Sequence, residues 1–180
     1  MNVIEAAIPG LLILEPKTFR DARGLFLESW NAAAYADVLG GAAFVQDNHS
    51  RSHKGVLRGL HYQIQQPQGK LVRVVRGAAF DVAVDIRRSS PTFGRWFGVE
   101  LSEDNFRQFW IPAGFAHGFV ALSDNVDFLY KTTDYYAPAH ERCIRWDDPD
   151  IAIGWPAGVD FILSDKDRAG ALLRDAEVFD

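Results

Sequence analysis

Three polar side chains that can do chemistry lie close together before the middle of the chain. Residues 46–63 read Gln-Asp-Asn-His-Ser-Arg-Ser-His-Lys-Gly-Val-Leu-Arg-Gly-Leu-His-Tyr-Gln, and residues 56–64 have the β-branched and aromatic content of a strand. That strand carries a guanidinium at Arg58, an imidazole at His61 and a carboxamide at Gln63. A cation that can hold an anionic ligand therefore lies near a base that titrates around neutral pH. This combination predicts a site.

The alternation of side chains along a strand complicates this prediction. Strict alternation puts Arg58 and His61 on opposite faces, so both can face one pocket only if Gly59 marks a bulge or the strand begins after it. A lone histidine in an apolar strand is also often a hydrogen-bonded core residue. The nearby Gln63 and Lys70 weigh against that interpretation, because adjoining strands would otherwise bury several polar groups without purpose.

Each of the other chemical candidates has a purely structural alternative. His117 is flanked by small residues and could belong to the core or to a site. Tyr130 could be a core aromatic with its hydroxyl at the rim, and Lys70 a solvated lysine at the start of a strand. Asp167 could be a surface charge or a helix cap. Asp81 could line the mouth of a barrel or face water on an open sheet.

Metal binding is another use of histidines in a β-barrel. Barrels of this kind often hold a metal with two histidines one residue apart plus a carboxylate, but the sequence contains no His-x-His. A metal needs about three or four protein donors. The sequence also lacks a nucleophile elbow, a phosphate loop and a dinucleotide glycine fingerprint. From the residues alone, we expect a barrel whose pocket holds a histidine base and cations for an anionic ligand, without a metal.

The elements that would position these side chains are short strands. Glycine or proline stands at nearly every junction, which is typical of a sandwich or barrel, and no helix separates successive strands as in a doubly wound parallel sheet. Helices are expected only at Asn31–Leu39, where Asn31 can cap and glycines end the helix, and near Arg168–Arg174. The sequence thus predicts one all-β domain over residues 1–180. The main predicted strands are residues 4–9, 11–14, 25–30, 56–64, 70–76, 78–86, 96–101, 106–111, 114–122 and 126–133.

Composition narrows the class of partner. The 180 residues are 48% hydrophobic, which is ample for one core, and the formal net charge is −5. An acidic chain argues against general nucleic-acid binding, whereas arginines clustered in the first half suit a small anionic ligand. With Cys143 as the only cysteine there is no disulfide framework. Neither a signal peptide nor an apolar membrane span is evident, so we expect a cytoplasmic protein without a membrane partner.

Several motifs in the same order resemble the dTDP-4-dehydrorhamnose 3,5-epimerase family. The resemblance runs from about Ile4 to about Arg174 and implies a mainly antiparallel jelly-roll barrel or sandwich of the cupin type, needing neither metal nor cofactor. The motifs are Phe19-x-Asp-x-Arg23-Gly-x-Phe26-x-Glu28, Gln46-Asp-Asn48-x-Ser50, Gly55-Val-Leu-Arg58-Gly-Leu-His61-Tyr-Gln63, Gln68-x-Lys70-Leu-Val, Asp81-Val-x-Val-Asp85-Ile-Arg87, Ser90-Pro-Thr-Phe-Gly94, Ile111-Pro-x-Gly-Phe-Ala-His117-Gly-Phe119 and Tyr130-Lys-Thr-Thr.

The resemblance implies a catalytic set. The substrate would be dTDP-4-dehydro-6-deoxy-D-glucose, whose C4 ketone acidifies the hydrogens on C3 and C5. His61 would be the base, and Asp167 would hold its imidazole in the right tautomer. Lys70 would stabilise the enolate oxygen. Tyr130 would return a proton from the opposite face of the sugar and so invert the carbon, giving dTDP-4-dehydro-L-rhamnose for dTDP-L-rhamnose biosynthesis.

The resemblance also implies substrate contacts and a partner. Arg58 and Arg23 would bind the diphosphate. The segment from Arg23 to Glu28 would reach the pocket of a second subunit, so the active unit would be a homodimer. The other implied substrate-binding residues are Glu28, Gln46, Asn48, His117, Glu141 and Lys166.

Three rival functions stay open at this point. A mono-epimerase that inverts only C3 or only C5 of another deoxysugar could keep the same base and tyrosine. A non-catalytic sugar-nucleotide-binding barrel would need neither His61 nor Tyr130. A metal-dependent cupin is the third.

Overall fold

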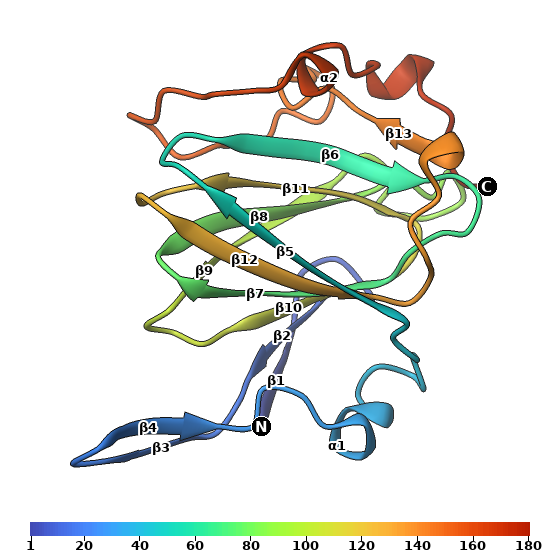
Figure 1. Cartoon of the computed structure of the whole chain (residues 1–180). Coiled ribbons are helices and arrows are strands. Elements are labelled where there is room, and N and C mark those ends of the chain that lie inside the picture. The colour runs from blue at the N-terminus through green and yellow to red at the C-terminus, as the bar shows by residue number, and fades with distance from the viewer.

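The computed structural model, which describes residues 1–180, contains two antiparallel sheets that face each other (Figure 1). The all-β prediction is therefore confirmed. In sheet order, the six-stranded sheet consists of β1 (Asn2–Glu5), β2 (Leu12–Glu15), β10 (Gln108–Ile111), β7 (Lys70–Arg76), β12 (Val126–Thr132) and β5 (Gln46–Ser52). The five-stranded sheet consists of β13 (Glu141–Cys143), β6 (Leu57–Gln63), β11 (Phe115–Ala121), β8 (Ala78–Asp85) and β9 (Trp96–Ser102).

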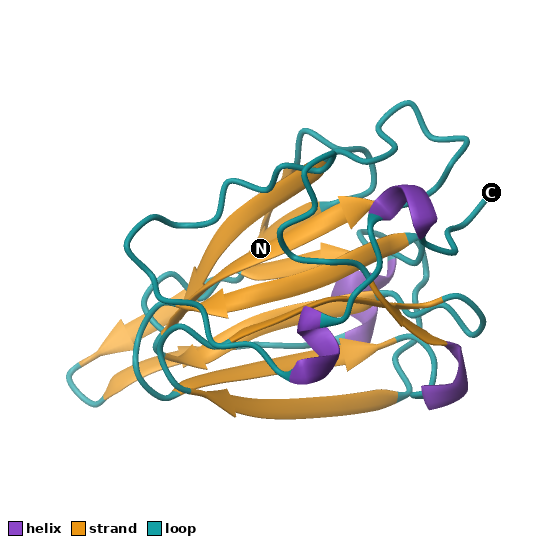
Figure 2. Ribbon diagram, turned by 90° about the horizontal axis from the view of Figure 1, so that it is seen from above, coloured by secondary structure: helices purple, strands orange, loops and turns teal.

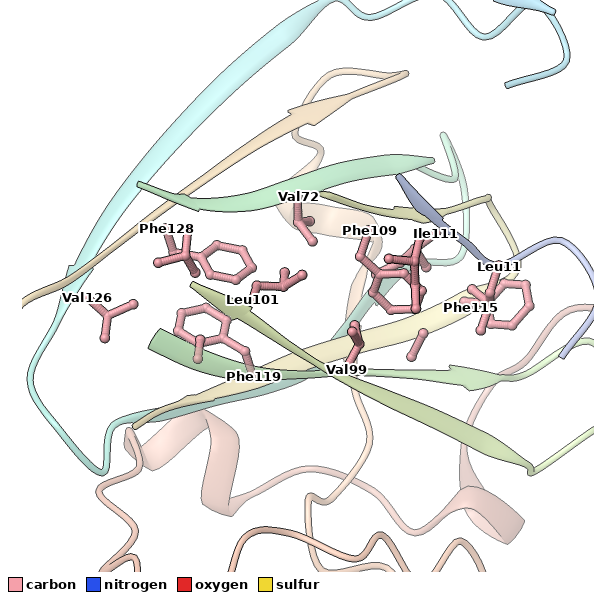
Figure 3. Packing of buried hydrophobic residues seen from close by; sticks show 14 of the residues in the cluster. Leu11, Val72, Val99, Leu101, Phe109, Ile111, Phe115, Phe119, Val126 and Phe128 are labelled. Atoms are coloured by element: carbon pink, nitrogen blue, oxygen red, sulfur yellow. The ribbon is translucent and has the colours of Figure 1, made fainter. Parts of the chain in front are cut away.

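The largest hydrophobic core fills the space between the two sheets (Figure 3). Phe119 of β11 and Phe128 of β12 stack with ring centroids 4.1 Å apart and so join one sheet to the other. Val72 and Phe109 also belong to the six-stranded side of this core. Burying a side chain of this size stabilises the fold by ~2 kcal/mol. The core thus holds the two sheets in a fixed relation, which fixes any site built between them.

A second core lies on the outer face of the five-stranded sheet. Leu60 and Tyr62 of β6 point away from the first core and pack with Ile144, Ile151 and Leu173 of the C-terminal region. This region follows β13 as long loops with short helical turns that lie across the strands in the view from above (Figure 2). It carries α2 (Asp165–Arg168) and places it against β6.

A separate hairpin projects from the body of the molecule (Figure 1). It consists of β3 (Thr18–Asp21) and β4 (Gly24–Leu27), which pair only with each other. Its Phe19 and Phe26 side chains are exposed, Phe26 by 68%. Exposed aromatics on a projecting hairpin are unusual for a surface that faces only water.

The structure corrects two predicted elements and adds one strand that was not predicted. Residues 4–9, predicted as one strand, are extended only as far as Glu5, where β1 ends. The helix expected near Arg168–Arg174 begins earlier and ends at Arg168 as α2, and a 3₁₀ turn follows at Leu173–Asp175. Residues 46–52, too polar to be predicted as a strand, form β5.

The first predicted helix is confirmed in a shorter form. It is α1 (Ala32–Ala36), and the Asn31 side chain accepts hydrogen bonds from the backbone of Ala33 and Ala34, as an N-cap should. The two short α-helices are the only α-helices, and neither is long and apolar enough to cross a membrane.

Candidate active site

A bulge in β6 brings two key side chains to one face. His117 of β11 pairs with His61 of β6, and Phe119 pairs with Arg58, so β6 has one more residue than β11 between the two pairs. The extra residue lies at Gly59, whose φ is +128°. A Cβ there would lie 2.5 Å from the Cα of Gly118, so only glycine fits. Of the two alternatives that the sequence allowed, the bulge is the one present, since β6 begins at Leu57, before Gly59. Arg58 and His61 both line one cavity.

That cavity lies between the two sheets and has a volume of about 210 Å³. His61 enters it from the five-stranded sheet, whereas Tyr130 of β12 and Lys70 of β7 enter it from the six-stranded sheet. An imidazole and a phenol therefore form opposing walls. The predicted site residues that line it are Arg58, His61, Lys70, His117, Tyr130 and Glu141.

His61 is held by a buried carboxylate from the C-terminal region. Its Nε2 atom lies 2.6 Å from Oδ1 of Asp167. The Ser164 hydroxyl donates to the other carboxylate oxygen at 2.7 Å, and the Gly59 backbone N–H reaches Oδ1 at 3.4 Å. Burial alone would raise the pKa of Asp167, but the hydrogen bonds from His61 and Ser164 outweigh burial and hold that pKa below its usual range.

This hydrogen bond decides which nitrogen of His61 can react. A charged carboxylate accepts the Nε2 proton and leaves Nδ1 as the unprotonated nitrogen of the neutral ring. The local sequence explains why the carboxylate is in place, since Ser164 caps α2 and its hydroxyl also accepts from the Asp167 backbone N–H. Asp167 is thus both in the first turn of a helix and a partner of His61.

Lys70 is a buried cation without a carboxylate in direct contact. Its Nζ atom donates to the backbone carbonyl of His61 at 3.2 Å. Burial lowers its pKa to about 8, and the charges of Asp81 and Glu141 oppose that shift only in part. Near pH 7 Lys70 is mainly protonated, and a desolvated ammonium interacts strongly with negative charge that develops in the cavity.

His117 forms a second buried histidine–aspartate pair. Its Nε2 atom lies 2.9 Å from Oδ2 of Asp81, and both residues are buried. Burial lowers the pKa of His117 and raises that of Asp81. His117 is therefore part of the core by burial and part of the site by position, and Asp81 faces neither water nor the barrel mouth.

Tyr130 keeps its proton more firmly than a free phenol. Burial raises its pKa, and the Glu141 carboxylate adds to that effect. Tyr130 pairs across the strands with Asn48 of β5, and its ring lies near that of Phe128. A protonated phenol in this position can donate a proton into the cavity.

The remaining cavity residues are held by specific contacts. Arg58 Nε donates to the Ser52 hydroxyl at 3.1 Å. Glu141 forms an ion pair with Lys166 at 2.5 Å and accepts from the Tyr136 hydroxyl at 2.7 Å. Lys166 thus reaches the rim of the cavity through Glu141.

Gln46 and Asn48 lie on the inner face of β5 rather than in the cavity lining. Gln46 donates to Asn48 at 2.9 Å and accepts from the Tyr136 backbone N–H at 3.0 Å. They therefore support the cavity at the strand beside Tyr130.

Two predicted site residues lie far from this cavity. Arg23 is in the β3–β4 hairpin, its side chain is 90% exposed, and its only charged partner is Asp21 at 2.6 Å. Glu28 follows the hairpin and accepts a hydrogen bond from Asn31. Neither residue lines the cavity that holds His61 in the same chain.

Comparison with known proteins decides the family. The family model described as dTDP-4-dehydrorhamnose 3,5-epimerase matches residues 5–175. The chain belongs to that family. It is 58% identical over 180 residues to the dTDP-4-dehydrorhamnose 3,5-epimerase of Pseudomonas aeruginosa, covering 99% of both chains, and 57% identical to that of Shigella flexneri, again covering 99% of both.

Solved structures of the epimerase family extend this likeness to the fold. The Legionella pneumophila epimerase in complex with dTDP-4-keto-L-rhamnose is 58% identical, with a TM-score of 0.95 over 98% of this chain and 94% of that one. A 3′-monoepimerase of Streptomyces bikiniensis in complex with dTDP-quinovose is 36% identical, with a TM-score of 0.89 over 94% of this chain and 86% of that one. The jelly-roll fold expected from the resemblance is confirmed.

One cluster of side chains around His61 has ligand atoms close enough together to hold a metal ion. His61, Cys143 and Asp167 each offer a ligand atom, and these atoms lie within 4.8 Å of one another. Burial raises the pKa of Cys143 to about 12, so the residue is a thiol rather than the thiolate that binds metals. Asp167 is already hydrogen-bonded through both oxygens. This chemistry suits a hydrogen-bonded proton relay better than a metal centre.

Some residues of the epimerase site could not be identified as such from the sequence. Ser52 orients Arg58, and Ser164 orients Asp167. Tyr136 and Gln68 also line the cavity. The only sequence signal for the two serines is local: Ser52 follows Ser50 in a polar strand, and Ser164 stands where an N-cap belongs.

Proposed function

We propose that the chain converts dTDP-4-dehydro-6-deoxy-D-glucose into dTDP-4-dehydro-L-rhamnose by epimerisation at C3 and C5, as a step of dTDP-L-rhamnose biosynthesis. Its family and its 58% identity with the Legionella pneumophila enzyme bound to dTDP-4-keto-L-rhamnose support this function. The observation that carries the chemistry is that His61, backed by Asp167, and Tyr130 stand on opposing walls of one cavity.

Inversion of a carbon requires a base on one face and an acid on the other. The C4 ketone acidifies the neighbouring C–H bonds, because loss of either proton leaves an enolate. Nδ1 of His61 takes the proton, and the Asp167 carboxylate stabilises the imidazolium that forms. Lys70 stabilises the charge on the enolate oxygen. Tyr130 then donates its proton to the opposite face of the carbon, and solvent restores the starting protonation states.

The substrate's diphosphate needs cations that the cavity supplies only in part. Arg58 is the arginine of the cavity, and a guanidinium suits phosphate oxygens. Gln46, Asn48, His117, Glu141 and Lys166 would contact the remaining parts of the substrate. The exposed Arg23 and Glu28 would act in the site of a second subunit, reached by the projecting hairpin. The active unit would then be a homodimer, in which the exposed Phe19 and Phe26 would be buried against the second subunit.

Proton exchange tests this function directly. The protein is incubated with dTDP-4-keto-6-deoxyglucose in D₂O, and the C3 and C5 protons are followed by NMR. Deuterium at both carbons is the expected result, and a rhamnose-specific reductase should then trap the product. Deuterium at one carbon alone would show that the chain is a mono-epimerase, like the Streptomyces bikiniensis relative.

A variant without the base separates catalysis from binding. His61→Asn keeps a polar, hydrogen-bonding side chain that cannot act as a base near neutral pH, and it should bind dTDP as the wild type does while losing exchange at both carbons. If the wild type bound the nucleotide sugar and exchanged neither proton, the chain would be a binding protein rather than an enzyme.

A further inference from the structure

One polar atom beside the cavity has no hydrogen-bond partner in the protein. The inner face of β5 carries Gln46, Asn48, Ser50 and Ser52 at alternate positions. Gln46 and Asn48 bond to each other, and Ser52 accepts from Arg58. The hydroxyl of Ser50 is buried and has no hydrogen-bond partner. Ser50 is thus the only one of these four side chains without a hydrogen-bond partner.

An unpartnered buried hydroxyl is destabilising, because it has lost its hydrogen bonds to water without replacing them, and such groups often have a functional reason. Ser50 lines the same cavity as His61 and Tyr130. Rotation about its single χ1 bond moves the hydroxyl between staggered positions. A ligand in the cavity can therefore provide the hydrogen bond that the protein does not.

The position of Ser50 indicates which part of a ligand it meets. Along β5, Asn48 stands opposite Tyr130, whereas Ser52 holds Arg58. Ser50 lies midway between Asn48 and Ser52, ~7 Å along the strand from each. Under the proposed function, Tyr130 faces the reacting sugar carbons and Arg58 faces the diphosphate. The group between a reacting C3 and the glycosidic oxygen is C2 with its hydroxyl.

We propose that Ser50 hydrogen-bonds the 2-hydroxyl of the hexose and makes the site selective for sugars that carry it. This inference rests on the proposed function. A serine hydroxyl can both donate to and accept from a sugar hydroxyl. A site built around such a bond discriminates against an analogue without the hydroxyl, because the protein group is then left unpaired.

Binding of two matched ligands tests the proposal. Calorimetric Kd values are measured for dTDP, dTDP-glucose and dTDP-2-deoxyglucose. The wild type should prefer dTDP-glucose over its 2-deoxy analogue by about 5–10-fold, the equivalent of one hydrogen bond. In Ser50→Ala this preference should vanish while the affinity for dTDP alone is unchanged. Ser50→Cys keeps the shape of the side chain with a slightly larger atom in place of the oxygen. Its thiol is a weak hydrogen-bonding group, so this variant should lose the preference in the same way.

Ser52→Ala is the matched control on the same face of the strand. Because Ser52 holds Arg58, this variant should weaken binding of all three ligands alike and keep the preference for the 2-hydroxyl. A preference that persists in Ser50→Ala, or one that is absent from the wild type, would overturn the proposal. A wild type that binds the ligands with this preference but catalyses no exchange would instead remove the proposed function and leave sugar recognition by Ser50 standing.

Discussion

Oδ1 of Asp167 lies 2.6 Å from Nε2 of His61, although 106 residues separate the two in the chain. The contact fixes the tautomer of the ring and directs Nδ1 away from the carboxylate. It also places a negative charge where an imidazolium would form. A base with these two supports is suited to repeated proton abstraction.

Removing the charge of Asp167 should therefore slow the chemistry more than binding. In Asp167→Asn we expect kcat to fall by about 10²–10⁴-fold, because a general base loses its orienting partner, with little change in KM. The control is Asp165→Asn, an exposed position in the same short helix, which should behave as the wild type. Equal losses in both variants would point to α2 as a structural element only.

Ser164 should act through Asp167. Its hydroxyl helps to keep the pKa of Asp167 low, so Ser164→Ala should raise that pKa. The charged carboxylate exists above the folded-state pKa and is lost as pH falls through it. Activity in Ser164→Ala should consequently decline at a higher pH on acidification than in the wild type, with a loss of about tenfold in kcat at the optimum.

A second substitution at Ser164 separates its two roles. Ser164→Asp keeps an N-cap acceptor for α2 but replaces the donor to Asp167 with a like charge. The free energy of unfolding should remain close to that of the wild type while kcat falls further than in Ser164→Ala. Recovery of activity along with stability would assign Ser164 to capping alone.

The pKa of Lys70 predicts that kcat/KM falls at alkaline pH. Burial lowers that pKa to about 8, so the ammonium is present below pH 8 and lost above it. A plot of kcat/KM for the wild type should fall by about tenfold per pH unit above that value. In Lys70→Arg the guanidinium stays charged, so the alkaline limb of the plot should move upward in pH even though the larger group lowers the maximum rate. An unchanged limb in that variant would assign it to another residue.

The hairpin predicts complementation between two inactive variants. Arg23→Ala keeps a complete His61–Asp167 pair, and His61→Asn keeps a complete hairpin. If the hairpin acts in the partner's site, each mixed dimer contains one intact site. Co-expression should restore about a quarter of wild-type activity, since about half of the dimers are mixed and half of their sites are intact. Two variants that remain inactive together would show that Arg23 acts in its own subunit.

The bulge at Gly59 should tolerate no side chain. Gly59→Ala would place Cβ 2.5 Å from the Cα of Gly118, and we expect a loss of at least ~2 kcal/mol in the free energy of unfolding together with loss of activity. Gly24 has a similar φ of +132° but no atom within 4 Å of an added Cβ. Gly24→Ala measures the backbone strain alone and should cost less than Gly59→Ala.

Local patterns predicted most of the strands that carry the site. Residues 70–76 form β7 as expected, because β-branched residues bounded by two glycines favour a strand. Alternation also indicated that the strand must either bulge at Gly59 or begin after it, if Arg58 and His61 are to face one pocket. That residues 1–180 form one domain stays a prediction.

What the sequence could not predict depends on contacts far along the chain. β5 was missed because its inner face supports a cavity instead of an apolar core, so its polar residues conceal a strand. The role of Asp167 followed only from family resemblance, since nothing near residue 167 indicates a histidine more than 100 positions earlier. The unpartnered hydroxyl of Ser50 could be found only in three dimensions.

The position of Asp167 in the C-terminal region determines when the pair with His61 can form during synthesis. The chain is synthesised from its N-terminus, so His61, Lys70 and Tyr130 leave the ribosome well before α2 does. Until residues 160–175 have emerged and packed on the outer face of the five-stranded sheet, His61 lacks the Asp167 carboxylate, and the core around Leu60 and Tyr62 lacks Leu173. A chain in which residues 160–175 have not yet packed thus lacks the hydrogen bond between His61 and Asp167, and the packing of this segment completes the candidate site.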